Sequence, residues 1–363
     1  MHMSKLFPSS NNMSAEQFSL APDYSISRVI KGGWQMSMGH TIGKQNDPQK
    51  AVADTLAFVR GGITTLDFGD IYLGVEEVVG EALKKLENEI GKDARDAIQL
   101  HTKYVPDLSS LPHLSYADVE TIIHRSRQRL GVEYLDLVQF HWWNYAVQGY
   151  VEALQHLARL QRDGYIRLLG VTNFDVQRMQ EFVDAGITPK TIQLQYSVLD
   201  HRPENGMAQF CQKHGIDLLC YGTVAGGFIS ERYLGVPEPQ PPFENRSLTK
   251  YKLIVDEFGG WDAFQTLLQV LDGIAKKYGC GISSIASSYI LSKPQVAAVI
   301  VGARDTSHLE ENKRTMQLQL AAEDINAISK AVSSGTDLRG DIYDLERNDP
   351  THSNIMHKHN NAK

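Results

Sequence analysis

Short apolar runs alternate along this chain with longer stretches whose apolar residues recur every three or four positions. Runs of four to seven residues rich in valine, isoleucine and leucine predict buried strands. They occur at 27–30, 63–68, 97–103, 134–140, 166–170, 191–195, 217–221 and 298–301. The helical period is clearest after the second strand, at Val75, Val78, Val79, Ala82, Leu83 and Leu86. The same period predicts further helices at 48–60, 115–130, 149–162, 176–185, 204–214, 261–278, 282–291, 308–314 and 323–332.

This alternation predicts an α/β fold with a parallel sheet and right-handed crossovers. Eight strand–helix units within roughly 300 residues fit a closed (β/α)₈ TIM barrel. An open doubly wound sheet is the alternative. No G-x-G-x-x-G follows a predicted strand, and the segment from Gly39 to Lys44 is too short for a phosphate-binding loop, so the fingerprints of the open folds are missing.

We expect a single domain at 25–336, with a flexible lead at 1–24 and a polar tail at 337–363 after the last helix. One region, 222–260, shows no sustained period and has four prolines within 237–242. A connection of this length without regular structure is usually functional, so we expect a long lid after the seventh strand.

Composition narrows the function by exclusion. The 363 residues are 42% hydrophobic and 22% charged, with a net charge of −7. The sequence has no basic stripe of the kind that would indicate nucleic-acid binding. No apolar run approaches the roughly 20 residues that are needed to cross a bilayer. Three cysteines without metal-ligand spacing, and an N-terminal segment without a signal-peptide core, predict a cytoplasmic protein with reduced thiols. We expect no metal site, and the oligomeric state stays open.

Four reactive side chains fall at the ends of three consecutive predicted strands. Asp67 ends the second strand, Tyr72 lies in the loop after it, Lys103 ends the third strand and His141 ends the fourth. Barrel enzymes place their active sites at the carboxyl ends of their strands. A phenol with a pKa near ~10 is a weak acid at neutral pH, and a neighbouring ammonium lowers that pKa. We therefore expect Lys103, kept charged by Asp67, to make Tyr72 acidic enough to protonate an alkoxide. His141 would hydrogen-bond the reacting oxygen.

Each of these residues alone has an ordinary structural explanation. An aspartate after a strand often stabilises a turn, a tyrosine ring is often half-buried with a solvated hydroxyl, and a histidine is often satisfied inside a core. Four complementary types on three consecutive strand ends are much less expected by chance, and this favours a catalytic site.

Longer motifs around these residues resemble the aldo-keto reductase superfamily. The motifs are Asp67 with Tyr72 five positions on, EEVVGEAL, Thr102-Lys103, YLDLVQFH, GVTNF, IQLQYS, and VGAR followed by EEN. The resemblance covers about 26–332 and implies a (β/α)₈ barrel that binds NADP(H) in extended form and interconverts aldehydes or ketones with alcohols. It implies that Tyr72 is the general acid and base, that Asp67 and Lys103 tune it, and that His141 orients the carbonyl.

The resemblance also assigns residues to the nicotinamide half of the cofactor. Asn173 and Gln193, with Thr172 beside them, are expected at the carboxamide. Tyr221 is expected to stack on the nicotinamide ring. Gly222 stands where many members have serine and is expected near the pyrophosphate.

The adenosine half of the cofactor is assigned to the last strand–helix loop. Gly302 opens this loop, Arg304 is expected to clamp the 2′-phosphate, and Glu311 and Asn312 are expected to hold adenine. His308 stands where relatives often have arginine or glutamine. NADP(H) is therefore the expected cofactor, and NADH a weaker alternative.

Aromatic residues near the strand ends suggest the substrate side. Trp34, Trp142 and Trp143 are expected to wall the barrel mouth and to suit an apolar or aromatic carbonyl compound. One of the last two is expected instead to pack beneath a neighbouring loop. For Arg246, in the lid, both a solvated position and a contact with the pyrophosphate stay open.

Two other functions remain as alternatives. A nicotinamide-binding regulatory or redox-sensing subunit, like channel β subunits, would use the same barrel with little turnover. A barrel enzyme using Lys103 as a Schiff-base amine would leave the expected cofactor residues without a role.

Overall fold

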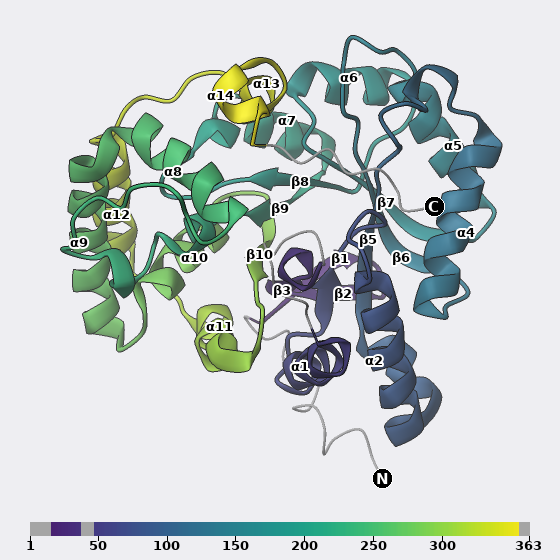
Figure 1. Ribbon diagram of the computed structural model, residues 1–363, viewed down its shortest axis with the longest axis horizontal. Coiled ribbons are helices and arrows are strands. Elements are labelled where there is room, and N and C mark those ends of the chain that lie inside the picture. The colour runs from purple at the N-terminus through teal and green to yellow at the C-terminus, as the bar shows by residue number, and fades with distance from the viewer. Residues whose placement is uncertain (1–15, 38–46, 356–363) are drawn as a thin grey trace.

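Eight parallel strands close into a barrel in the computed structural model, which describes residues 16–37 and 47–355 (Figure 1). The strands are hydrogen-bonded in the order β10-β3-β4-β5-β6-β7-β8-β9. Their bounds are β3 (Val29–Gly32), β4 (Thr65–Asp67), β5 (Gln99–Tyr104), β6 (Leu135–Phe140), β7 (Ile166–Thr172), β8 (Thr191–Gln195), β9 (Asp217–Tyr221) and β10 (Val296–Gly302). Each corresponds to a predicted strand, and the predicted barrel is confirmed. The segment from Gly39 to Lys44 lies outside the described residues.

Helices surround the barrel and bury their apolar faces against it (Figure 1). The predicted helices correspond to α1 (Pro48–Arg60), α2 (Val75–Ile90), α4 (Tyr116–Leu130), α5 (Tyr150–Arg162), α6 (Val176–Asp184), α7 (Met207–His214), α9 (Gly260–Tyr278), α10 (Ile282–Leu291), α11 (Leu309–Gln317) and α12 (Ala322–Ser333). Local signals explain where they begin. The Asp47 side chain accepts hydrogen bonds from two backbone N–H groups at the start of α1. Ser115 and Asp118 form a capping box at the start of α4.

An antiparallel hairpin precedes the barrel. The expectation of a flexible lead at 1–24 is therefore wrong for residues 17–24, which belong to this hairpin. It consists of β1 (Gln17–Ala21) and β2 (Tyr24–Ser27). Leu20, Tyr24 and Ile26 are buried in one cluster with barrel-interior residues such as Leu137 and Leu219. The hairpin thus supplies apolar side chains to the core inside the barrel. Its two strands are short and mix serine with apolar residues, which obscures their pattern in the sequence.

The region predicted as an irregular lid is partly helical. Its second half forms α8 (Arg246–Phe258), which begins where the Asn245 side chain accepts from the Leu248 N–H at 3.0 Å. The helix buries Leu248, Tyr251, Ile254, Val255 and Phe258. This correction follows from an apolar helical period that the preceding prolines mask.

The described part of the tail after α12, residues 337–355, contains α13 (Ile342–Asn348) and α14 (Pro350–Ser353). Figure 1 shows the chain crossing from α12 to these two helices, drawn in yellow. Ile342 and Tyr343 are buried, so the tail packs on the domain. The remaining short elements are α3 (Ala94–Ala97) and the 3₁₀ turns η2 (Trp34–Met36), η3 (Gly91–Asp93), η4 (Leu111–His113), η5 (Arg202–Glu204), η6 (Ala225–Gly227), η7 (Glu231–Tyr233) and η8 (Thr306–His308). Among the described residues, no helix is long and apolar enough to span a membrane.

Candidate active site

A buried ion pair joins the neighbouring strands β4 and β5. Lys103 Nζ donates to Asp67 Oδ1 at 2.5 Å and to the Phe68 carbonyl at 2.7 Å. The two charged side chains are only 6% and 5% exposed. Burial acts to lower the pKa of Lys103, but the charges of Asp67 and Tyr72 and the hydrogen bonds to both side chains together outweigh it, and the pKa lies above its ordinary value. Lys103 is therefore a fixed cation.

Two amides hold the other oxygen of the Asp67 carboxylate. Gln139 in β6 and Gln193 in β8 each donate from Nε2 to Asp67 Oδ2 at 2.7 Å. Gln193, which the resemblance assigns to the nicotinamide, thus has its amide nitrogen on the carboxylate. Gln139 was missing from the predicted site. The sequence feature that could have identified Gln139 is its single amide side chain within the apolar run that leads to His141.

Tyr72 lies in the turn between β4 and α2, beside this ion pair. Its N–H donates to the Gly69 carbonyl at 2.9 Å, and Lys103 Nζ lies 4.9 Å from the centroid of its ring. Burial raises the pKa of Tyr72, while the charge and hydrogen bond of Lys103 act to lower it. The net direction is upward, so the expected acidic phenol is corrected. Lys103 offsets part of a burial effect, and the phenol keeps its proton at neutral pH.

His141 follows β6 and is a neutral imidazole. Its Nδ1 lies 3.3 Å from the Thr172 carbonyl. A carbonyl only accepts, so this contact places the proton on Nδ1 and leaves Nε2 as an acceptor. Burial, and then the charges of Arg347 and Lys103, lower the pKa of His141 to about 3. The Trp143 and His141 rings pack nearly perpendicular to each other, with their centroids 4.7 Å apart.

Asn173 and Tyr221 meet at the ends of β7 and β9. The Tyr221 hydroxyl donates to Asn173 Oδ1 at 3.0 Å. Asn173 has a φ of 60°, a left-handed conformation that asparagine tolerates better than most residues. Lys250 from α8 lies over the Tyr221 ring, 5.3 Å from its centroid. These residues carry amide and aromatic groups, together with the buried Thr172 hydroxyl, to the same end of the barrel as His141.

Comparison with known proteins gives the family of this barrel. The model of the aldo/keto reductase family matches residues 28–333, which is most of the chain. The chain belongs to this family. The resemblance inferred from its motifs is thereby confirmed.

Individual relatives align with this chain over most of their own length. The NADH-specific methylglyoxal reductase of Escherichia coli (strain K12) is 26% identical over 318 residues, covering 83% of this chain and 93% of that protein. Protein tas of the same organism is 28% identical over 327 residues, covering 80% and 91%. The structure of a glycerol dehydrogenase from Gluconobacter oxydans superposes with a TM-score of 0.74 at 23% identity, covering 91% of this chain and 98% of that chain. This last similarity supports the fold.

The nicotinamide cofactor of this family fits the donor set at the ends of β7, β8 and β9. A carboxamide needs one donor and one acceptor. Asn173 Oδ1 is engaged with Tyr221, which leaves its amide nitrogen as the donor. Gln193 Nε2 is engaged with Asp67, which leaves its Oε1 as the acceptor. The half-buried Tyr221 ring stands beside them.

The loop after β10 carries the residues expected at the adenosine half. Arg304 and His308 are exposed, and Asn312 is half-buried. Gly302 is overlaid by Gln35, since a Cβ at Gly302 would lie 1.8 Å from Gln35 Nε2. A side chain at this position would therefore require the flexible Gln35 side chain to move.

Glu311 has a structural role that the resemblance does not indicate. Its Oε1 accepts from the Gly281 N–H at 2.6 Å and from the Ser284 hydroxyl at 2.5 Å, so it caps the start of α10. Gly222 follows Tyr221 with a φ of 79°, and a Cβ there would lie 2.5 Å from the Tyr251 hydroxyl. The contacts of Glu311 and Gly222 with the cofactor stay predictions. For Arg246, at the start of α8, the solvated position and the contact with the pyrophosphate both stay open.

The three expected aromatic walls separate into two groups. Trp34 and Trp143 are half-buried, and the Trp34 ring lies 5.0 Å from that of Tyr72. Trp142 is 0% exposed, and its indole N–H donates to the carbonyls of Asn144 and Val147. Trp142 is therefore a core residue rather than a substrate wall, because its ring is enclosed and its polar atom is satisfied.

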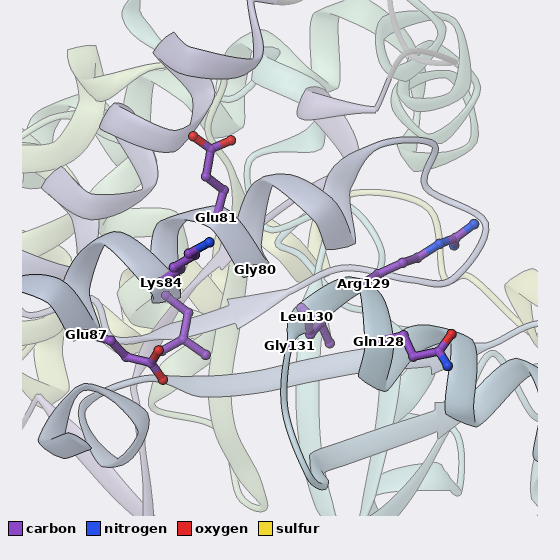
Figure 2. Close-up of a pocket in the computed structure, with 9 residues that line it drawn as sticks. Gly80, Glu81, Lys84, Glu87, Gln128, Arg129, Leu130 and Gly131 are labelled. Carbon is purple, nitrogen blue, oxygen red and sulfur yellow. The ribbon is translucent and has the colours of Figure 1, made fainter. Parts of the chain in front are cut away.

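A surface groove of about 460 Å³ lies away from these residues, between α2 and α4. Figure 2 shows its charged rim, with Glu81, Lys84 and Glu87 on α2 and Arg129 on α4. The two helices approach each other closely at Gly80, where a Cβ would lie only 2.4 Å from the Arg129 carbonyl. None of the predicted site residues lines this groove. The described residues also contain no group of three histidine, cysteine or acidic side chains placed to hold a metal.

Proposed function

We propose that this aldo/keto reductase interconverts a small aldehyde or ketone with its alcohol, with Tyr72 as the proton donor and acceptor. The observation that carries the proposal is the buried Asp67–Lys103 pair beside the Tyr72 ring. A structural loop does not require an enclosed cation next to a phenol, because enclosing a charge costs free energy.

The direction of proton transfer follows from the pKa shifts. Tyr72 is protonated at neutral pH, because burial raises its pKa. An alkoxide is far more basic than a phenolate, so Tyr72 can donate to an oxygen on which negative charge develops. Lys103 then stabilises the phenolate that is left. His141 stays neutral and accepts a hydrogen bond from the product hydroxyl at Nε2.

The nicotinamide supplies or receives the hydride when it is bound. We propose that Thr172, Asn173, Gln193 and Tyr221 hold its ring, and that Arg304 and His308 face the 2′-phosphate of NADP(H). One relative is NADH-specific by name, so the choice of dinucleotide needs a direct measurement. Arg304→Ala should weaken NADPH at least tenfold more than NADH in a fluorescence titration, because a guanidinium binds a phosphate by paired hydrogen bonds. Equal weakening of both dinucleotides would remove Arg304 from the 2′-phosphate.

Turnover of a carbonyl panel tests the proposal. Aldehydes and ketones are assayed by loss of absorbance of NADPH and NADH, with the wild type, Tyr72→Phe and the control Tyr116→Phe. Tyr116 lies at the start of α4, where its hydroxyl donates to Glu120. Tyr72→Phe should lower kcat by at least 10³-fold with little change in dinucleotide affinity, and Tyr116→Phe should leave both unchanged.

Two outcomes would contradict this mechanism. Retained turnover in Tyr72→Phe would show that another group donates the proton. Dinucleotide binding by the wild type without turnover of any carbonyl would favour the sensing subunit over the enzyme.

A further inference from the structure

The C-terminal helix α13 reaches the active site through one side chain, Arg347. Its Nη2 donates to the Trp142 carbonyl at 2.9 Å and to the Asn173 carbonyl at 3.0 Å. Trp142 directly follows His141 at the end of β6, and Asn173 follows Thr172 at the end of β7. One guanidinium therefore bridges the two strand ends that carry His141 and its hydrogen-bond partner.

We propose that Arg347 is a positioning residue for the active site, in which its guanidinium fixes the backbone that carries His141 and Asn173. The inference rests on the proposed function, because it assigns a role in the same reaction. It adds a residue from the segment that the sequence suggests is only a polar tail.

The backbone at Asn173 needs such support. Asparagine adopts a left-handed φ more readily than most residues, but the conformation is still uncommon, and contacts at its carbonyl hold it in place here. The Asn173 carbonyl accepts from both Arg347 and the Tyr145 hydroxyl, the latter at 3.1 Å. The Arg347 guanidinium lies over the Tyr145 ring, 4.0 Å from its centroid. Arg347 and Tyr145 thus form one stacked pair that holds a single carbonyl group.

The charge of Arg347 provides a second link to the site. Arg347 and Lys103 are the charged groups that act on His141, and both favour its neutral form. No carboxylate within the described residues forms an ion pair with Arg347. Asp341 lies nearer the start of α13, and burial raises its pKa to about 6. Because Asp341 would titrate in the same range as an ordinary histidine, the test must observe His141 itself.

Three variants separate charge, positioning and simple attachment of the tail. Arg347→Met removes the donors and keeps an apolar stem on Tyr145. Arg347→Lys keeps the charge but loses the planar fork. Arg339→Met is the control, because Arg339 is exposed on the same segment and pairs with Asp337.

The measurements are kcat and KM on a substrate from the carbonyl panel, the urea unfolding midpoint, and the NMR titration of the His141 imidazole in protein without cofactor. The His141 signal is assigned by its absence in a His141→Asn variant. Arg347→Met should lower kcat by about ten- to a hundredfold and raise the His141 titration midpoint by about one pH unit. Arg347→Lys should lower kcat by a smaller factor and keep the low midpoint. Arg339→Met should change neither.

The following results would overturn the role proposed for Arg347. Wild-type kcat and an unmoved His141 midpoint in Arg347→Met would overturn the proposal, even with a lower unfolding midpoint, because Arg347 would then only attach the tail. If Arg347→Met does not fold, wild-type kcat in Arg347→Lys overturns the positioning role. If the wild type reduces no carbonyl, the proposed reaction fails, while the titration of His141 still decides whether Arg347 acts on it.

Discussion

Replacing Asp67 by asparagine isolates the contribution of the buried ion pair to stability. The asparagine oxygen can still accept from the amides of Gln139 and Gln193, which leaves its NH₂ group facing Lys103 Nζ. A donor then meets a donor at the 2.5 Å contact, and the ammonium loses its counter-charge. Removing one partner of a buried pair typically costs about 3–5 kcal/mol, because an uncompensated charge is left behind. We therefore expect the free energy of unfolding to fall by about that amount.

A double-mutant cycle in urea distinguishes this mechanism from a general loss of packing. Lys103→Met alone leaves the Asp67 carboxylate buried with only its amide donors, so it should also be destabilising. The double variant Asp67→Asn/Lys103→Met contains no buried charge at this position, and we expect it to be at least about 2 kcal/mol more stable than additivity predicts. Additive losses would show that the two charges do not stabilise each other in the folded protein. All three variants should lose carbonyl reduction, since the cation beside Tyr72 is absent or unpaired.

Two further predictions concern residues outside the catalytic set. Burial lowers the pKa of Lys31 from 10.5 to about 8, so Lys31→Met should stabilise the protein by up to about 3 kcal/mol at pH 7. Between these two pKa values the unfolded chain binds more protons than the folded protein, so the free energy of unfolding of the wild type should rise from pH 8 to 10.5. The stability gained by Lys31→Met should therefore shrink over this pH range in urea unfolding. A gain that stays constant would contradict the pKa shift. Trp142→Ala should cost about 3–5 kcal/mol of unfolding free energy, whereas Trp143→Ala should raise KM with a smaller loss of stability, and the reverse pattern would restore Trp142 as a substrate wall.

The barrel and the four central residues could be predicted because both depend on local signals. Apolar runs mark the strands, and the ends of consecutive parallel strands lie side by side in any such barrel. That rule alone brings Asp67, Lys103 and His141 together. The net pKa of Tyr72 could not be predicted in the same way, because it depends on how far the surrounding chain buries the ring. A neighbouring cation is visible in a sequence, but the extent of burial is not.

The C-terminal segment escaped prediction because polar contacts between distant residues hold it in place. Arg347 and the Asn173 carbonyl that it binds are 174 positions apart, and Lys250 of α8 forms an ion pair with Glu346 of α13. Hydropathy gives such a segment little signal, since its few buried apolar residues, such as Ile342 and Tyr343, stand among charged residues that usually mark a solvated tail.

The chemistry of these contacts suggests what the segment contributes. A buried ion pair adds little net stability over an apolar pair, but a wrong arrangement leaves charges unpaired and is strongly disfavoured. The His352 imidazole of α14 contacts Glu257, and Glu257 in turn pairs with the buried Arg202. These contacts therefore select one arrangement of the tail more than they strengthen the fold. A segment held in this way is suited to constraining the backbone beside His141, which requires a defined position and little binding energy.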